Sequence, residues 1–539
     1  MENKSNAYYQ IANRKFIEKE YGEYGKSLWV QISGHKDLNG ADALFWCVLV
    51  EKNNVDVVFR DHSWDVPIGE GGPGFIDDGD NVKYRSNKLG DEFEPLLYYR
   101  EFYGIKKPVN ELSQEFILLN NIYFDEQKKA YCTILENGTT EEVVRVIGEN
   151  TFLIKLSYLT RYAAAKQMAA VLFYDIRTNF DVDTKELGVK KFSDEHKDKN
   201  VFYQVYGGNL EVIPKNAFSV LTGKKIIYPG PVETCGYWPF EKEKEFVEFL
   251  IGIDENGNEK SFTCNPDKLA NYFGNNRGAP LYLTPVFFKR EVLLKYISKP
   301  DLYSIDDGYL RCNGLWGIAI DNDHKDCISV YLGDLGRDLP ESEMLYWKSF
   351  NIVSDEGVSV TSFKRDFLGI PADSDMIDHK FKGHYIETNE AWNRKFGWPL
   401  FVPLTNDDQH NFDTLRIPLT EESQPEFDGL ILSLVKVLID SLNEKKFQEN
   451  IESEKDLKGI GKLEKWLERS GYNDFKTHIK FLRNLQELRS KGTGHRKGNG
   501  YNKIASSFGV GDKKLKEVFE DILSKADAFL IYMNNLMEK

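Results

Sequence analysis

The stretch KTHIKFLRNLQELRSKGTGHRKGNGY, residues 476–501, decides the fold of the C-terminal part of this chain. Ile479, Leu482 and Leu485 recur at three-residue spacing, which places them on one face of a helix. Glycines then alternate with basic residues and a single histidine, a pattern typical of a loop that follows a helix. The stretch therefore predicts a helix with a buried face, followed by a basic loop.

Helical periodicity continues on both sides of this stretch. Before it, eight apolar residues form a broad face: Leu430, Ile431, Leu434, Val435, Val437, Leu438, Ile439 and Leu442. After it, nine apolar residues follow three-four spacing: Leu515, Val518, Phe519, Ile522, Leu523, Ala526, Phe529, Leu530 and Met533. Residues 426–539 are therefore predicted to form an all-α bundle. The broad first face suggests a partner on more than one side, which favours a homodimer through this bundle.

The preceding chain has a different character, so the fold class expected is multi-domain α+β. Residues 1–195 read as a mixed α/β domain, with strands at 27–32, 43–50 and 151–156 and a helix after the last of these. Residues 196–425 read as a β-rich middle domain, separated by a polar hinge at 183–200. Within the middle domain, 314–336 reads as two strands joined by an acidic turn. The segment 417–429 reads as a linker to the helical bundle.

Composition places the chain among soluble globular proteins. It has 539 residues, of which 41% are hydrophobic and 29% charged. There is no apolar run long enough for a membrane span and no signal-peptide pattern, so a cytoplasmic location is expected. The six cysteines (Cys47, Cys132, Cys235, Cys264, Cys312 and Cys327) are scattered. They are expected to be reduced and mostly buried, with neither a zinc site nor a disulfide framework.

Positive charge is concentrated around the opening stretch. Residues 476–516 hold eleven Lys and Arg against Glu487 and Asp512, a local net charge of +9, whereas the whole chain carries −15. The rest of the chain therefore carries −24 and repels polyanions, which excludes a general nucleic-acid coat. A basic island on such a body can still hold one phosphodiester segment.

Arg489 closes the predicted helix and His495 follows in the basic loop, and these two side-chain types suit the chemistry of RNA cleavage. RNA supplies its own nucleophile, the 2′-hydroxyl, and His495 could move the proton at that step. Arg489 could hold the phosphate oxygens and offset their developing charge. No metal and no cofactor is required by this chemistry. The remaining RNA contacts are assigned to nearby polar and basic residues: Arg483, Ser490, Lys491, Arg496 and Lys497.

This R-x5-H arrangement, late in a helical bundle, resembles the HEPN superfamily of nucleases. The resemblance implies a metal-independent endoribonuclease, products that end in 2′,3′-cyclic phosphate, and a cleft made by two subunits. The family often has Asn, Asp or His directly after the arginine, where this chain has Ser490. Antitoxin-partnered members carry a tyrosine two residues after the histidine. Lys497 occupies that position here, which argues against the AMPylated-toxin variant.

The layout also resembles bacterial toxins and phage-defence effectors that act by abortive infection. In that interpretation the first 425 residues respond to a phage-derived or protein trigger and control the nuclease. Two alternatives remain open. The helical region could be a non-catalytic dimerisation module that binds nucleic acid or a protein partner, or an unrecognised active site could lie within residues 1–425. The acidic run Asp321–Asp326 could bind a cation, but its spacing does not fit an EF-hand and favours a polar hairpin turn.

Overall fold

The computed structural model describes residues 2–13, 26–38, 41–60, 73–77, 79, 81–85, 93–210, 216–405, 407–451, 457–493 and 497–538. The chain divides into two units, described separately below. The first comprises Met1–Leu135 and Thr139–Glu243, and the second comprises Glu136–Gly138 and Lys244–Lys539. None of the helices in the described ranges combines the length and the apolar character that a bilayer crossing requires.

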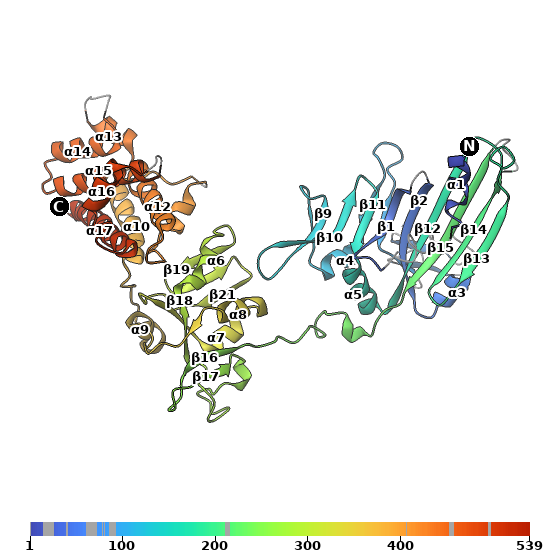
Figure 1. The fold of residues 1–539 in the computed structure, drawn as a ribbon, viewed down its shortest axis with the longest axis horizontal. Helices are drawn as coiled ribbons and strands as arrows, with labels where there is room; N and C mark the ends of the chain where they lie inside the picture. Colours follow the sequence, from blue (N-terminus) through green and yellow to red (C-terminus); the bar gives the residue numbers. More distant parts are fainter. Residues whose placement is uncertain are drawn as a thin grey trace. The chain divides into compact units, whose positions relative to one another are not determined.

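The first unit is built on one broad antiparallel sheet of eleven strands (Figure 1). Their order is β13-β14-β15-β12-β2-β1-β11-β10-β9-β8, and β5 also pairs with β2. The strands are β1 (Trp29–Leu38), β2 (Ala41–Glu51), β5 (Phe93–Pro95), β8 (Tyr123–Asp125), β9 (Ala130–Ile134), β10 (Thr140–Ile147), β11 (Thr151–Lys155), β12 (Met168–Phe180), β13 (Phe192–Lys197), β14 (Val201–Asn209) and β15 (Ala217–Ile227). Two further hairpins are β3–β4 (Gly74–Asp77, Val82–Arg85) and β6–β7 (Leu97–Arg100, Val109–Leu112).

Both faces of the central strands are covered, which explains why β2 and β12 are so apolar. One apolar cluster joins the sheet to α4 (Gln114–Leu119) and α5 (Leu156–Lys166) through Phe116, Leu159 and Tyr162. A second cluster on alternate residues joins it to α3 (Val55–Arg60). Helix α1 (Glu2–Gln10) contacts β12 and β15. The strands predicted at 43–50 and 151–156, and the helix after the latter, are confirmed.

The polar segment 183–200 contains an edge strand as well as turns. Strand β13 covers Phe192–Lys197 and pairs with β14 in an antiparallel register. Its side chains from Ser193 to Lys197 are exposed. A charged edge strand of this kind discourages pairing with other chains, and its polarity explains why it read as a hinge.

The second unit begins with small β-structures around an aromatic core. Strands β16 (Glu248–Ile253) and β17 (Glu259–Thr263) form a hairpin, and two three-stranded sheets follow. One has the order β22-β18-β23 (Cys327–Tyr331, Pro285–Lys289, Asn351–Ile352), and the other β19-β20-β21 (Tyr303–Asp306, Tyr309–Cys312, Trp316–Ala319). The helices here are α6 (Leu294–Ile297), α7 (Leu332–Asp338) and α8 (Glu341–Lys348).

The expected strand pair at 314–336 is present but is not a hairpin. Strand β21 pairs with β20, whereas β22 pairs with β18 in the other sheet. Only an isolated bridge between Asp321 and Ser329 links the two segments. The acidic segment between them is therefore a crossover between sheets, held in place by side-chain contacts.

Helices make up the rest of the second unit. They are α9 (Val360–Leu368), α10 (Ile377–Phe396), α11 (Gln409–Asp413), α12 (Gln424–Val435), the π-helix η4 (Lys436–Asp440), α13 (Glu444–Asn450), α14 (Gly459–Arg469), α15 (Lys476–Thr493), α16 (Asn499–Ser507) and α17 (Leu515–Glu538). The C-terminal helical region predicted from the sequence is thus confirmed. All nine apolar residues listed for 515–533 are buried, as are Ile479, Leu482 and Leu485.

Helix α10 also belongs to this bundle, although it precedes residue 426, where the bundle was expected to begin. Figure 1 shows it among the helices of the C-terminal region. Its buried side chains Phe381, Tyr385 and Trp392 share one apolar cluster with the face at 430–442. Strands β13–β15, on both sides of the expected boundary at 195/196, complete the first sheet, and α9–α11 precede α12.

Candidate active site

Arg489 lies near the end of α15, at the border of that helix's buried face. Leu485 and Leu488 are buried in the bundle, and the side chain of Arg489 is 29% exposed. Its Nη2 donates to Asp440 Oδ2 at 2.6 Å. Asp440 is the last residue of the π-helix η4, and such local irregularities are frequent at functional sites. The arginine is therefore held at the bundle surface by a carboxylate from another helix.

The residues after Arg489 continue the helix. Helix α15 extends to Thr493, so Ser490, Lys491 and Gly492 are helical and do not belong to the loop. A Cβ at Gly492 would lie 3.1 Å from the Tyr501 ring on α16, which is closer than ordinary packing. This glycine therefore allows α15 and α16 to pack closely at the motif.

His495 and Arg496 lie outside the described residues, so the geometry of the Arg489–His495 pair is not part of the structure described. Lys497, the next described residue, is tied to α12. Its Nζ lies 2.6 Å from Asp428 Oδ2 and 4.8 Å from the centre of the Tyr501 ring. Gln424 donates to both Asp428 Oδ1 and the Tyr501 hydroxyl. Residues on both sides of the histidine are thus anchored to the α12–η4 segment.

The basic island is largely paired with acids. Seven of the ten cations that the structure describes here form ion pairs: Arg483 with Glu464, Arg489 with Asp440, Lys491 with Glu487, Lys497 with Asp428, Lys513 with Asp521, Lys514 with Glu421 and Lys516 with Asp326. Most of these partners come from other elements of the second unit. Ser490 is exposed, as are Lys476, Lys480 and Lys503. The sequence could locate the cations but not the carboxylates that fold against them.

A separate cavity of about 640 Å³ lies between the β-structures and the helices of the second unit. Two histidines of α10 line it, each close to a carboxylate. His379 Nδ1 lies 3.7 Å from Asp307 Oδ1, and His384 Nδ1 lies 2.7 Å from Asp527 Oδ1 on α17. Burial raises the pKa of Asp307, but the paired Arg365 and the nearby His379 outweigh it and keep this pKa below its usual value. No sequence pattern indicates this cavity, because its lining comes from segments far apart in the chain.

No protein-family model, no curated protein and no solved structure matches this chain.

Proposed function

We propose that the chain is a metal-independent endoribonuclease of the HEPN type, with Arg489 and His495 as its catalytic residues. The observation that carries the proposal is Arg489 near the end of a helix in an all-α bundle, half-buried and fixed by Asp440, six residues before the histidine. A fixed guanidinium needs little reorganisation when charge develops on a phosphate, and this is the basis of electrostatic catalysis.

The proposed reaction needs only the RNA and the arginine and histidine side chains of the cleft. The ribose 2′-oxygen attacks the adjacent phosphorus, a 2′-O–P bond forms, and the P–O5′ bond breaks. A base takes the 2′-hydroxyl proton, and an acid returns a proton to the departing 5′-oxygen. One product ends in a 2′,3′-cyclic phosphate and the other begins with a 5′-hydroxyl. Arg489 would stabilise the negative charge on the phosphate oxygens.

The proposal predicts cleavage of RNA in the presence of a metal chelator. Purified full-length protein should cut single-stranded RNA in EDTA at an unchanged rate. A substrate with a 2′-deoxyribose at the cleaved position should resist, because it lacks the nucleophile. Mass spectrometry of the fragments should find cyclic phosphate ends. Cleavage of the 2′-deoxy substrate, or 5′-phosphate products, would contradict the mechanism.

A homodimer is part of the proposal. The apolar face at 430–442 does not need a partner subunit, since α10 and the other helices cover it within one chain. The dimer therefore rests on the resemblance, in which two Arg-His pairs serve one cleft. We expect a dimer by light scattering at micromolar concentration. A monomer that cleaves RNA at full rate would exclude a shared cleft.

The biological role follows from the layout alone. We place the protein in the cytoplasm as an anti-phage, abortive-infection effector whose first 425 residues take a phage-derived or protein trigger and restrain the nuclease. This part of the proposal rests on an analogy of domain organisation. It is separate from the proposed site, because function is defined by the site residues and not by the layout.

The cavity lined by His379 and His384 of α10 favours a second candidate function, an active site or ligand site away from Arg489. Its specific support is the His384–Asp527 pair, because a carboxylate bonded to one ring nitrogen orients a histidine as a general base. One comparison separates the candidates. Loss of RNA cleavage in His384→Ala, with wild-type cleavage in His495→Ala, would move the chemistry to this cavity.

A further inference from the structure

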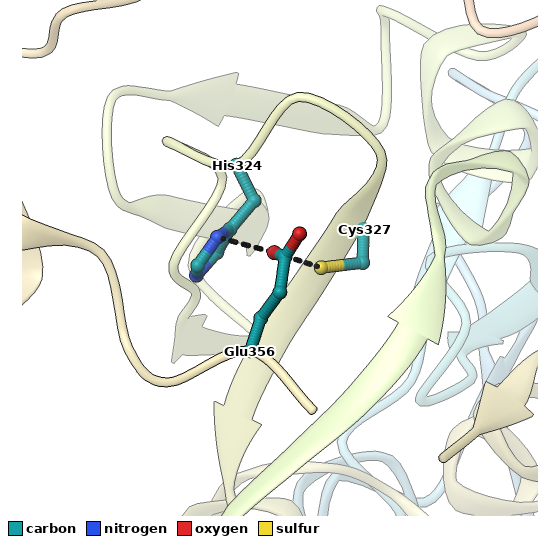
Figure 2. Close-up of side chains that lie close together, drawn as sticks. All are labelled: His324, Cys327 and Glu356. Atoms are coloured by element: carbon teal, nitrogen blue, oxygen red, sulfur yellow. Dashed lines mark hydrogen bonds and ion pairs between the residues drawn. The ribbon is translucent and has the colours of Figure 1, made fainter. Parts of the chain in front are cut away.

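Three side chains from two segments of the second unit converge beside strand β22. His324 lies in the crossover before β22, Cys327 begins that strand, and Glu356 lies between β23 and α9. Figure 2 shows the three side chains pointing toward one another. Glu356 Oε2 lies 3.1 Å from His324 Nδ1 and 3.5 Å from Cys327 Sγ. Imidazole nitrogen, thiol sulfur and carboxylate oxygen thus lie within 4.8 Å of one another.

These separations suit a tetrahedral metal ion. Zinc binds nitrogen and oxygen at roughly 2.0–2.2 Å and sulfur at about 2.3 Å, so neighbouring ligands in a tetrahedron lie roughly 3.3–3.7 Å apart. The two distances to Glu356 are close to this range. Small side-chain adjustments would bring all three ligand atoms around one cation.

The far side of the histidine carries the contact expected of a metal ligand. His324 Nε2 lies 3.1 Å from Asp321 Oδ2. Asp321 also accepts a hydrogen bond from the Ser359 backbone at 2.7 Å, which fixes its position. A carboxylate on one ring nitrogen holds the proton there and leaves the lone pair of the other nitrogen for the metal. The crossover itself is fixed by the buried Arg290, which donates to the carbonyl groups of Asn322 and His324.

We propose that His324, Cys327 and Glu356 bind a zinc ion, with Asp321 as the positioning residue behind the histidine. A thiolate and an imidazole favour zinc over magnesium or calcium, which prefer oxygen ligands. Glu356 is 54% exposed, so a water molecule can fill the fourth position. The ion would fasten the segment before α9 to β22. The scattered cysteines predicted no zinc site, and the proposal departs from that expectation, because Glu356 follows Cys327 by 29 positions.

Metal binding would exchange protons for the ion. Cysteine binds zinc as a thiolate, so the Cys327 thiol would release its proton on binding. Zinc would displace this proton to solvent as the S–Zn bond forms, and no oxidant or reductant is involved.

The test uses the full-length protein, stripped of metal and titrated with Zn²⁺ or Co²⁺. We expect one tightly bound equivalent at this site and, with cobalt, a sulfur-to-cobalt charge-transfer band in the near ultraviolet. Cys327→Ser should remove the band. The matched control is Cys132→Ser in the first unit, a buried cysteine whose Sγ donates to the Ala130 carbonyl. This control should bind like wild type.

Two further variants keep the test decisive if Cys327→Ser fails to fold. Glu356→Gln changes an exposed side chain and should weaken zinc binding without unfolding the protein. Asp321→Asn should retain the cobalt band but lower the affinity about 10–100-fold, the usual effect of removing an outer carboxylate. No cobalt band in wild type, or zinc affinity unchanged in Glu356→Gln, would overturn the proposal. RNA cleavage is not a readout here, so failure leaves the proposed nuclease untouched.

Discussion

His495→Ala is expected to lower the rate of RNA cleavage about 10²–10⁴-fold, the typical effect of losing an acid-base group. The helices on both sides of the histidine supply the buried residues of the bundle. The stability of the folded protein should therefore change little in this variant. Single-turnover cleavage and thermal unfolding of both proteins measure the two quantities. Toxicity on expression in bacteria should disappear with the cleavage.

Lys503→Ala is the matched control for this variant. Lys503 is exposed on α16, so its replacement removes one positive charge from the same region without altering the Arg489–His495 motif. It should cleave RNA at nearly the wild-type rate once RNA is saturating. Wild-type cleavage by His495→Ala would exclude the histidine from catalysis.

Arg489→Lys should lose most turnover while RNA binding is largely retained. A lysine can still reach Asp440 with one charged hydrogen bond, so the link between α15 and η4 should survive. It cannot reproduce a planar two-point grip on a phosphate. Removing one preorganised stabiliser of developing charge costs on the order of 10²–10³ in turnover. Single-turnover rates at two salt concentrations, with binding measured separately, provide the test.

Lys497→Ala provides the contrast. Its amine is shared between Asp428 and the Tyr501 ring, so we assign it to binding and to holding the loop. RNA affinity should fall, and the slope of log K against log salt concentration should decrease by about one, as expected for the loss of one phosphate contact. Turnover at saturating RNA should be nearly unchanged. Equal, salt-sensitive losses in Arg489→Lys, Lys491→Ala, Arg496→Ala and Lys497→Ala would mean that the stretch is a binding patch without catalytic residues.

Sequence periodicity predicted the buried faces of α15 and α17, because three-four spacing depends only on the helix itself. It missed α10 although the signal was present. Phe381, Tyr385, Thr388 and Trp392 follow a four-three-four spacing, and all are buried. The polar residues between them, and the aromatic-rich sequence before them, made the segment read as part of a β-rich domain. Helix α10 is recognisable only if its buried stripe is considered apart from its average composition.

The site was predictable only where its residues are close in sequence. The R-x5-H spacing is visible in the chain, and so is the basic island. The carboxylates that pair with these cations cannot be recognised in the sequence, since Asp440 precedes Arg489 by 49 positions and Asp428 precedes Lys497 by 69. The His324–Cys327–Glu356 cluster was hidden for the same reason. Long-range contacts of this kind depend on how sheets and helices pack.

The pairing of α10 with α17 also constrains the order of events during protein synthesis. Thr388 Oγ1 donates to the Leu530 carbonyl across 142 positions of the chain. At roughly 5–20 residues per second, a ribosome needs roughly 7–28 s to cover that interval. Throughout this time the buried residues of α10 cannot pack against α17, which has not yet been synthesised. The bundle that holds Arg489 can therefore close only after α17 has emerged, so in the proposed function an unfinished chain presents no completed nuclease to the RNA of the ribosome that is making it.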